Sequence, residues 1–182
     1  MSELKDIQHY MRDGTLRLTA LPPLSLYVHL PWCLKKCPYC DFNSHALKDD
    51  SSAPRAGARV AARLPVDQEV AYVAALLLDL EADLPLLEDA SDRAVSSVFI
   101  GGGTPSLFSA AAIARLLQGL RERLPLAVDC EVTLEANPGT LERGRFAGYR
   151  EAGVNRISVG AQSFSAANIG THCATRCAVL AC

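Results

Sequence analysis

The sequence lacks a long uninterrupted hydrophobic run and a large block of charge of one sign. Its longest apolar stretches, such as residues 70–78, are ended by charge well short of the ~18 residues that a membrane-spanning helix needs. The formal net charge is −2, so nothing indicates a nucleic-acid or anionic-membrane partner. The first six residues, Met-Ser-Glu-Leu-Lys-Asp, also lack the basic-then-apolar order of a signal peptide. We therefore expect one sizeable core and partners that are small molecules or proteins.

Cysteine is too sparse for a disulfide scaffold. The 182 residues contain 7 cysteines, an odd number. Three lie within residues 33–40, Cys130 stands alone in a predicted strand, and three fall in the last ten residues. This usage predicts the reducing cytoplasm, where thiolates remain available to bind metal.

The three clustered cysteines are the strongest signal in the chain. Cys33, Cys37 and Cys40 follow a short apolar run with spacings of x3 and then x2. Thiolates favour iron–sulfur clusters or zinc, and a closed structural site requires four ligands. Three cysteines on a four-iron cluster leave one iron open, which is a property of a reactive site. The alternative is a zinc site completed by His29, His45 or Asp41.

Predicted strands and helices alternate along the chain, which implies parallel strands joined by right-handed crossovers. The predicted strands are residues 24–28, 95–100, 130–135 and 156–159. The predicted helices are residues 67–85, a second capped by Ser109, and residues 141–152 closed by Gly153. Their expected inner faces are Val70, Val73, Leu76, Leu77, Leu80 and Leu84 in the first, and Ile113, Leu116, Leu117 and Leu120 in the second.

Unusual residues sit at the carboxyl ends of these strands, where α/β proteins gather their chemistry. The glycines of Gly101-Gly-Gly-Thr-Pro could let the backbone approach a ligand and point N–H groups at it, or could form an ordinary turn. Burying the Glu135 carboxylate without a positive charge nearby is unfavourable. Glu135 therefore either faces the positively charged end of a ligand or forms a salt bridge with Arg143 or Arg156. Gln162 is a ligand or a strand-end amide satisfied by backbone. Tyr27 and Tyr39 could be core aromatics, and His29 fits best as a support beside the cysteines.

These motifs together resemble the radical S-adenosylmethionine (SAM) superfamily, in the branch of oxygen-independent coproporphyrinogen III oxidases and HemW-type heme chaperones. The resemblance implies an α/β fold that is a partial (β/α) barrel, of which the first four or so β/α units are present here. It also implies a [4Fe–4S] cluster on Cys33, Cys37 and Cys40. SAM would contact Tyr27, Tyr39, Gly102, Gly103, Thr104, Glu135 and Gln162. The segments that carry the resemblance are residues 27–33, 36–45, 100–108, 134–139 and 153–164.

Within that branch, the resemblance favours the heme chaperones. The similar oxidases carry a further cysteine two residues after the third cluster ligand, and Phe42 holds that place here. The expected partners are SAM, heme, an electron donor and heme-accepting respiratory proteins. The alternative is a porphyrinogen oxidase, which would decarboxylate propionate side chains through a SAM-derived radical. A zinc-stabilised module without redox chemistry is the third possibility.

The expected domains are an extension over residues 1–23, a radical SAM core over 24–164 with a surface insertion at 48–65, and a non-family tail over 165–182. The tail fits no helical or strand period, and we interpret it as the end of a truncated or frameshifted product that could be inactive. The alternative is a second metal site formed by His172, Cys173, Cys177 and Cys182.

Overall fold

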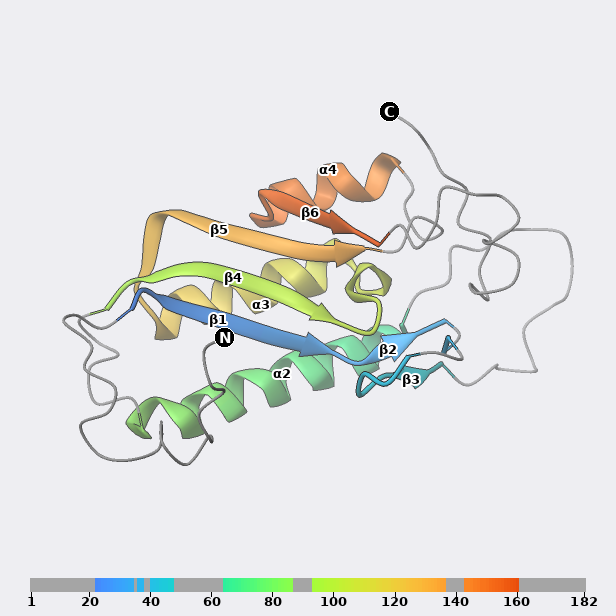
Figure 1. The fold of residues 1–182 in the computed structure, drawn as a ribbon, viewed down its shortest axis with the longest axis horizontal. Coiled ribbons are helices and arrows are strands. Elements are labelled where there is room, and N and C mark those ends of the chain that lie inside the picture. Colours follow the sequence, from blue (N-terminus) through green and yellow to red (C-terminus); the bar gives the residue numbers. More distant parts are fainter. Residues whose placement is uncertain are drawn as a thin grey trace, which may run out of the picture.

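Four parallel strands form the main sheet in the order β1 (Leu24–Leu30), β4 (Val95–Gly102), β5 (Leu126–Ala136) and β6 (Arg156–Val159). The computed structural model describes residues 22–34, 36–37, 40–47, 64–86, 93–136 and 143–160. Order in space follows order along the chain, so each crossover moves one strand in the same direction. The helices α2 (Val66–Asp83), α3 (Ala110–Arg123) and α4 (Arg143–Ala152) lie along one side of the sheet (Figure 1). The predicted α/β class and parallel sheet are confirmed.

The first helix differs from the sequence prediction on one face. Val73 is fully buried as expected, but Val70 is 42% exposed and Glu69 is only 3% exposed. Glu69 accepts hydrogen bonds from the backbone N–H of Ser109 at 2.7 Å and from its hydroxyl at 2.6 Å. The helix therefore rotates a carboxylate, not Val70, toward the start of α3. It ends in a short 3-10 turn, η1 (Leu84–Leu86).

The other two helices begin and end close to the predicted positions. The Ser109 hydroxyl accepts from the N–H of Ala112 and caps α3, as predicted. The expected inner face of α3 is buried at all four positions, Ile113, Leu116, Leu117 and Leu120. After α4, Gly153 adopts a φ of +109°, the left-handed conformation that favours glycine at a helix end. The strand that follows, β6, has the predicted bounds.

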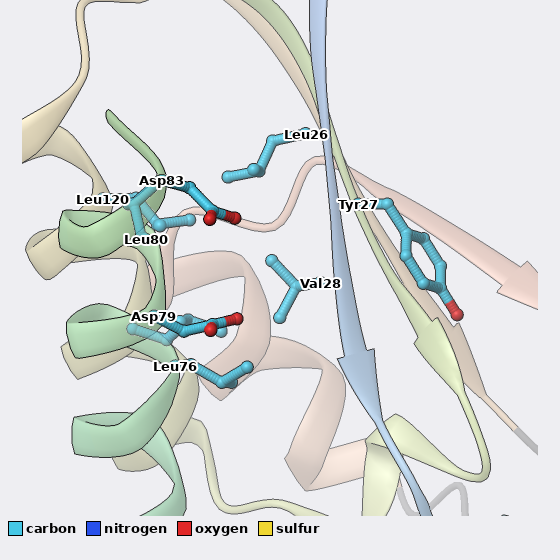
Figure 2. Close-up of a pocket in the computed structure, with 9 residues that line it drawn as sticks. Leu26, Tyr27, Val28, Leu76, Asp79, Leu80, Asp83 and Leu120 are labelled. Atoms are coloured by element: carbon cyan, nitrogen blue, oxygen red, sulfur yellow. The ribbon is translucent and has the colours of Figure 1, made fainter. Parts of the chain in front are cut away.

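The sheet has two faces with different surroundings. Leu26 and Val28 on β1 point toward α2, whereas Tyr27 points to the opposite face (Figure 2). A cavity of about 120 Å³ lies between β1 and α2, with Asp79 and Asp83 among its lining residues. This cavity lies on the helix side, away from the Tyr27 ring, and is not where the sequence motifs meet.

One row of side chains crosses all four strands on the face opposite the helices. The strands are paired so that Tyr27 is in register with Phe99, Phe99 with Thr133, and Thr133 with Arg156. Because side chains alternate between faces along a strand, His29 and Glu135 share this face two residues further toward the carboxyl edge.

Two short strands not anticipated from the sequence flank the cysteine loop. β2 (Trp32–Cys33) pairs in parallel with β3 (His45–Ala46) at the carboxyl end of β1 (Figure 1). A 3-10 turn, η2 (Pro105–Leu107), follows β4 nearby. Leu64, which fell within the predicted surface insertion, is buried and its N–H donates to Leu107 O, so the insertion ends before it. Residues 48–63 and the tail lie outside the described residues.

Candidate functional site

Cys33 is the last residue of β2, and Cys37 and Cys40 lie on the loop between β2 and β3. Cys33, Cys37 and Cys40 are half-buried free thiols, and the N–H of Cys40 donates to Cys37 O at 3.1 Å. None of the three is in a disulfide. The loop therefore presents three potential thiolate ligands at the carboxyl edge of the sheet.

The glycine motif fixes this loop in place. The N–H of Gly103 donates to Leu30 O at 2.8 Å, and the N–H of Thr104 donates to Trp32 O at 2.7 Å. A Cβ on Gly103 would lie 2.6 Å from the carbonyl oxygens of Pro31 and Trp32, so only glycine permits this approach. In this structure the N–H of Gly102 donates to Glu135 Oε2 and that of Gly103 to Leu30 O, and the role of both glycines toward a ligand stays a prediction. The glycines hold the cysteine loop against β4.

Two buried hydroxyl groups contact two of the three sulfurs. The Thr104 Oγ1 lies 3.6 Å from Cys33 Sγ, and the Ser44 Oγ lies 3.6 Å from Cys40 Sγ. Thr104 is 8% exposed and Ser44 4% exposed. The family resemblance predicts a SAM contact for Thr104 and not a contact with Cys33. For Ser44, the only signal in the sequence is its place four residues after Cys40.

Glu135 stands at the end of β5 without a cationic partner among the described residues. Its Oε2 accepts from the N–H of Gly102 at 3.2 Å. Arg156, one of the two arginines expected to pair with it, instead contacts Glu131 Oε1 at 3.4 Å. That alternative is therefore wrong for Arg156, and the side chain of Arg143 lies outside the description. A half-buried carboxylate is left facing the open side of the sheet.

Tyr27 and His29 link this face to the cysteine loop. The Tyr27 hydroxyl lies 2.8 Å from His29 Nδ1, and His29 Nε2 lies 2.8 Å from Asn43 O. Tyr27 is 57% exposed, so it is not a core residue. Partial burial and, secondarily, the Glu135 carboxylate raise the pKa of the Tyr27 phenol above its ordinary value. His29 thus supports the loop, as expected.

A zinc knot finds little support in this arrangement. Both ring nitrogens of His29 already have partners, and His45 Nε2 lies 3.1 Å from Asn43 Oδ1. Within the described residues, no three His, Cys, Asp or Glu side chains are grouped closely enough to hold a single metal ion. A four-iron cluster does not require the three thiolates to converge on one ion, because each thiolate binds a different iron atom. Tyr39 and Gln162 lie outside the described residues, and their roles stay predictions.

No helix in the described part of the chain is long and apolar enough to cross a membrane.

Known proteins share both the sequence and the fold. The chain is 55% identical to the heme chaperone HemW of Escherichia coli (strain K12) over 148 residues, which cover 81% of this chain and 34% of that protein. It is 52% identical to the heme chaperone HemW of Haemophilus influenzae, over 80% of this chain and 34% of the relative. The solved structure of coproporphyrinogen III oxidase (HemN) from Escherichia coli, described as a radical SAM enzyme, matches with a TM-score of 0.60 at 33% identity. That match covers 79% of this chain and 29% of the oxidase.

These comparisons confirm the resemblance and the partial-barrel fold expected from the motifs. The chain spans about a third of the length of the curated relatives it matches. The sequence model of the radical SAM superfamily matches residues 27–177, which include the cysteine loop, the glycine motif and Glu135, and which run beyond Phe164, where the resemblance read from the motifs ended. With this match over most of its length, the chain belongs to the radical SAM superfamily.

Proposed function

We propose that this chain is the cluster- and SAM-binding part of a heme chaperone similar to HemW. The observation that carries the proposal is the loop of three free thiols, held at the carboxyl edge of the sheet beside Tyr27 and Glu135. Its partners would be SAM, heme, an electron donor and heme-accepting respiratory proteins. Its compartment would be the reducing cytoplasm, where the thiols remain reduced.

The donor set suits an iron–sulfur cluster. Cys33, Cys37 and Cys40 supply three thiolates, one short of a closed four-cysteine site. When bound, a cluster with one open iron supplies a docking point for SAM and the electron that cleaves it to methionine and a 5′-deoxyadenosyl radical. The protein contributes the positions of the thiolates and the exclusion of water around them.

Residues on the open face of the sheet suit a cationic ligand. Glu135 carries a negative charge that no ion pair among the described residues balances, so it can attract the positive end of SAM. The N–H of Gly102 contacts Glu135, and Gly103 packs against the backbone of Pro31 and Trp32, directly before Cys33. Tyr27 extends from β1 on the same face. We propose that these residues, with Thr104, Tyr39 and Gln162, surround SAM.

Two observations favour a heme chaperone over a porphyrinogen oxidase. Phe42 occupies the position of the oxidases' further cysteine, and this residue is 66% exposed, two positions after Cys40. Identity to the two named chaperones is 55% and 52%, against 33% to the oxidase structure. An exposed phenyl ring cannot ligate iron, but it offers apolar surface of the kind that a porphyrin covers.

Anaerobic reconstitution tests the cluster and SAM sites. We expect the chain supplied with iron and sulfide to become coloured, to retain both elements after desalting and to bind SAM. Cys33→Ala should lose these properties, whereas Cys130→Ala, which removes a buried cysteine in β5, should keep them. Zinc without iron in the purified chain, or a Cys33→Ala variant that still forms the cluster, would contradict the proposal.

Heme titration and a decarboxylation assay separate the two activities. We expect the reconstituted chain to bind heme with a saturable absorbance change and to release no carbon dioxide from coproporphyrinogen III. Decarboxylation in the absence of heme binding would instead assign the chain to the oxidases.

A further inference from the structure

Cys33 and Cys40 have a buried hydroxyl group as neighbour, whereas no such contact to Cys37 occurs among the described residues. We propose that Thr104 and Ser44 donate hydrogen bonds to the sulfurs of Cys33 and Cys40 and thereby raise the reduction potential of the cluster. This inference rests on the proposed function only in requiring that the three cysteines hold iron and sulfide.

The position of each hydroxyl is fixed by backbone hydrogen bonds. Thr104 is held by its N–H, which donates to Trp32 O at 2.7 Å, directly before Cys33. Ser44 is held by its N–H, which donates to Phe42 O at 2.7 Å, and by the start of β3 one residue later. Both side chains are thus attached to the backbone that carries the cysteines, so the O···S contacts follow from the fold.

Burial and iron binding together determine which atom donates each of these hydrogen bonds. A buried hydroxyl without a hydrogen bond is unfavourable, and the sulfur is the only partner of either hydroxyl among the described residues. An iron-bound thiolate carries no proton, so it can only accept a hydrogen bond. In the loaded protein both hydroxyls must therefore be donors and both sulfurs acceptors.

Donated hydrogen bonds favour the reduced cluster. The electron added on reduction increases the negative charge on the sulfurs, and an O–H donor stabilises that charge more than it stabilises the oxidised form. Hydrogen bonds to sulfur are among the established determinants of iron–sulfur potentials. Thr104 and Ser44 are therefore positioning residues that act through the sulfurs, and their loss should make the cluster harder to reduce.

A redox titration followed by electron paramagnetic resonance tests this without SAM or heme. In the anaerobically reconstituted chain, Thr104→Val and Ser44→Ala should each lower the reduced-to-oxidised ratio at a fixed potential by up to about tenfold, or about 59 mV for one electron. The double variant should show the sum, because the two hydroxyls contact different sulfurs. Thr104→Ser and Ser44→Thr, which keep the hydroxyl, should resemble the parent chain. Ser97→Ala, which removes a hydroxyl bonded to Ser25 near the opposite end of β4, is the matched control.

Two results would overturn the inference. The first is an intact cluster with an unchanged potential in both Thr104→Val and Ser44→Ala. The second is an equal loss of iron from the hydroxyl-removing and hydroxyl-keeping variants, which would assign these positions to packing alone. A parent chain that takes up no iron and sulfide would overturn the proposed function as well, so the two failures are distinguishable.

Discussion

Tyr27 and Glu135 interact across the open face of the sheet, and their coupling can be measured. Burial and then the Glu135 charge raise the pKa of Tyr27 above its ordinary value of 10.0. Glu135→Gln should lower this pKa but leave it above the ordinary value, because burial is the larger cause. An ultraviolet titration of phenolate absorbance, with Tyr27→Phe as reference, measures the shift. An unchanged titration in Glu135→Gln would contradict the interaction.

The raised pKa of Tyr27 determines whether the contribution of this residue to stability rises or falls with pH. The folded protein holds the Tyr27 proton more tightly than the unfolded chain does. This contribution is therefore fully present below about pH 10 and is lost as the pH rises through the folded-state pKa. Urea unfolding at pH 9 and above should show a smaller loss of stability with pH for Tyr27→Phe than for the parent chain. Parallel pH dependences in the two proteins would show that Tyr27 does not contribute.

Gly103 provides a test of how the cysteine loop is held. A Cβ at this position meets the backbone oxygens of Pro31 and Trp32 at 2.6 Å, and backbone cannot move aside as a side chain can. Gly103→Ala should lower the free energy of unfolding by about 1–3 kcal/mol and weaken iron retention. Gly148→Ala is the control for iron retention: its Cβ would lie 2.9 Å from Ala110 Cβ, so it should also lose stability, but it lies on α4 and not against the cysteine loop and should keep iron. Normal iron retention in Gly103→Ala would show that the close approach is unimportant.

At the residue scale, sequence spacing predicts which side chains reach the carboxyl edge but not their hydrogen-bond partners. The glycine motif lies at the carboxyl end of its strand, as predicted. Its N–H groups, however, bond to Leu30 O and to the Glu135 carboxylate, acceptors that lie on other strands. Ser44 is a similar case, because its contact with Cys40 Sγ depends on the turn at Phe42, and no periodic pattern encodes that turn.

Among the elements, α2 and α3 are joined through a buried carboxylate. Glu69 accepts two hydrogen bonds from Ser109, and Ser109 in turn caps α3. Glu69→Ala should lower the free energy of unfolding by about 1–3 kcal/mol, because the half-buried N–H and hydroxyl of Ser109 both lose their acceptor. Urea denaturation measures the change. Glu81→Ala, which removes an exposed ion pair with Arg123, should cost under about 1 kcal/mol, and equal losses for the two would contradict this role.

The elements themselves were largely predictable, and the exceptions have a common physical cause. Among the described residues, the sequence pattern located the three α-helices and the four strands of the main sheet, with β6 and the caps of α3 and α4 placed as expected; β5, however, begins at Leu126, four residues before its predicted start. Hydrophobic periodicity alone predicts Val70 on the buried face of α2. Glu69 is buried instead, because its carboxylate accepts hydrogen bonds from Ser109. The two-residue strands β2 and β3 are too short to carry a period, and they form because the cysteine loop folds back on itself.

At the scale of the whole molecule, the cysteine loop and the main sheet should unfold together. Trp32 is the only tryptophan in the sequence, and it packs edge-on against Tyr72 of α2 with ring centroids 4.5 Å apart. Hydrogen bonds from Gly103 and Thr104, directly after β4, and from the Tyr72 hydroxyl, which donates to His29 O, tie this region to the sheet. Tryptophan fluorescence and far-ultraviolet circular dichroism should therefore give the same urea midpoint. An earlier fluorescence transition would show that the loop opens independently.

The contacts of Gly103 and Thr104 with the cysteine loop also constrain when that loop can fold during translation. The Thr104 hydroxyl reaches Cys33 from 71 residues further along the chain. At ordinary elongation rates that separation corresponds to roughly 4–14 s of translation. For most of this interval the nascent chain carries all three thiols, but Gly103 and Thr104, which hold the loop, have not yet been synthesised. The cysteine loop therefore cannot reach its folded arrangement until residues 103 and 104 have been synthesised.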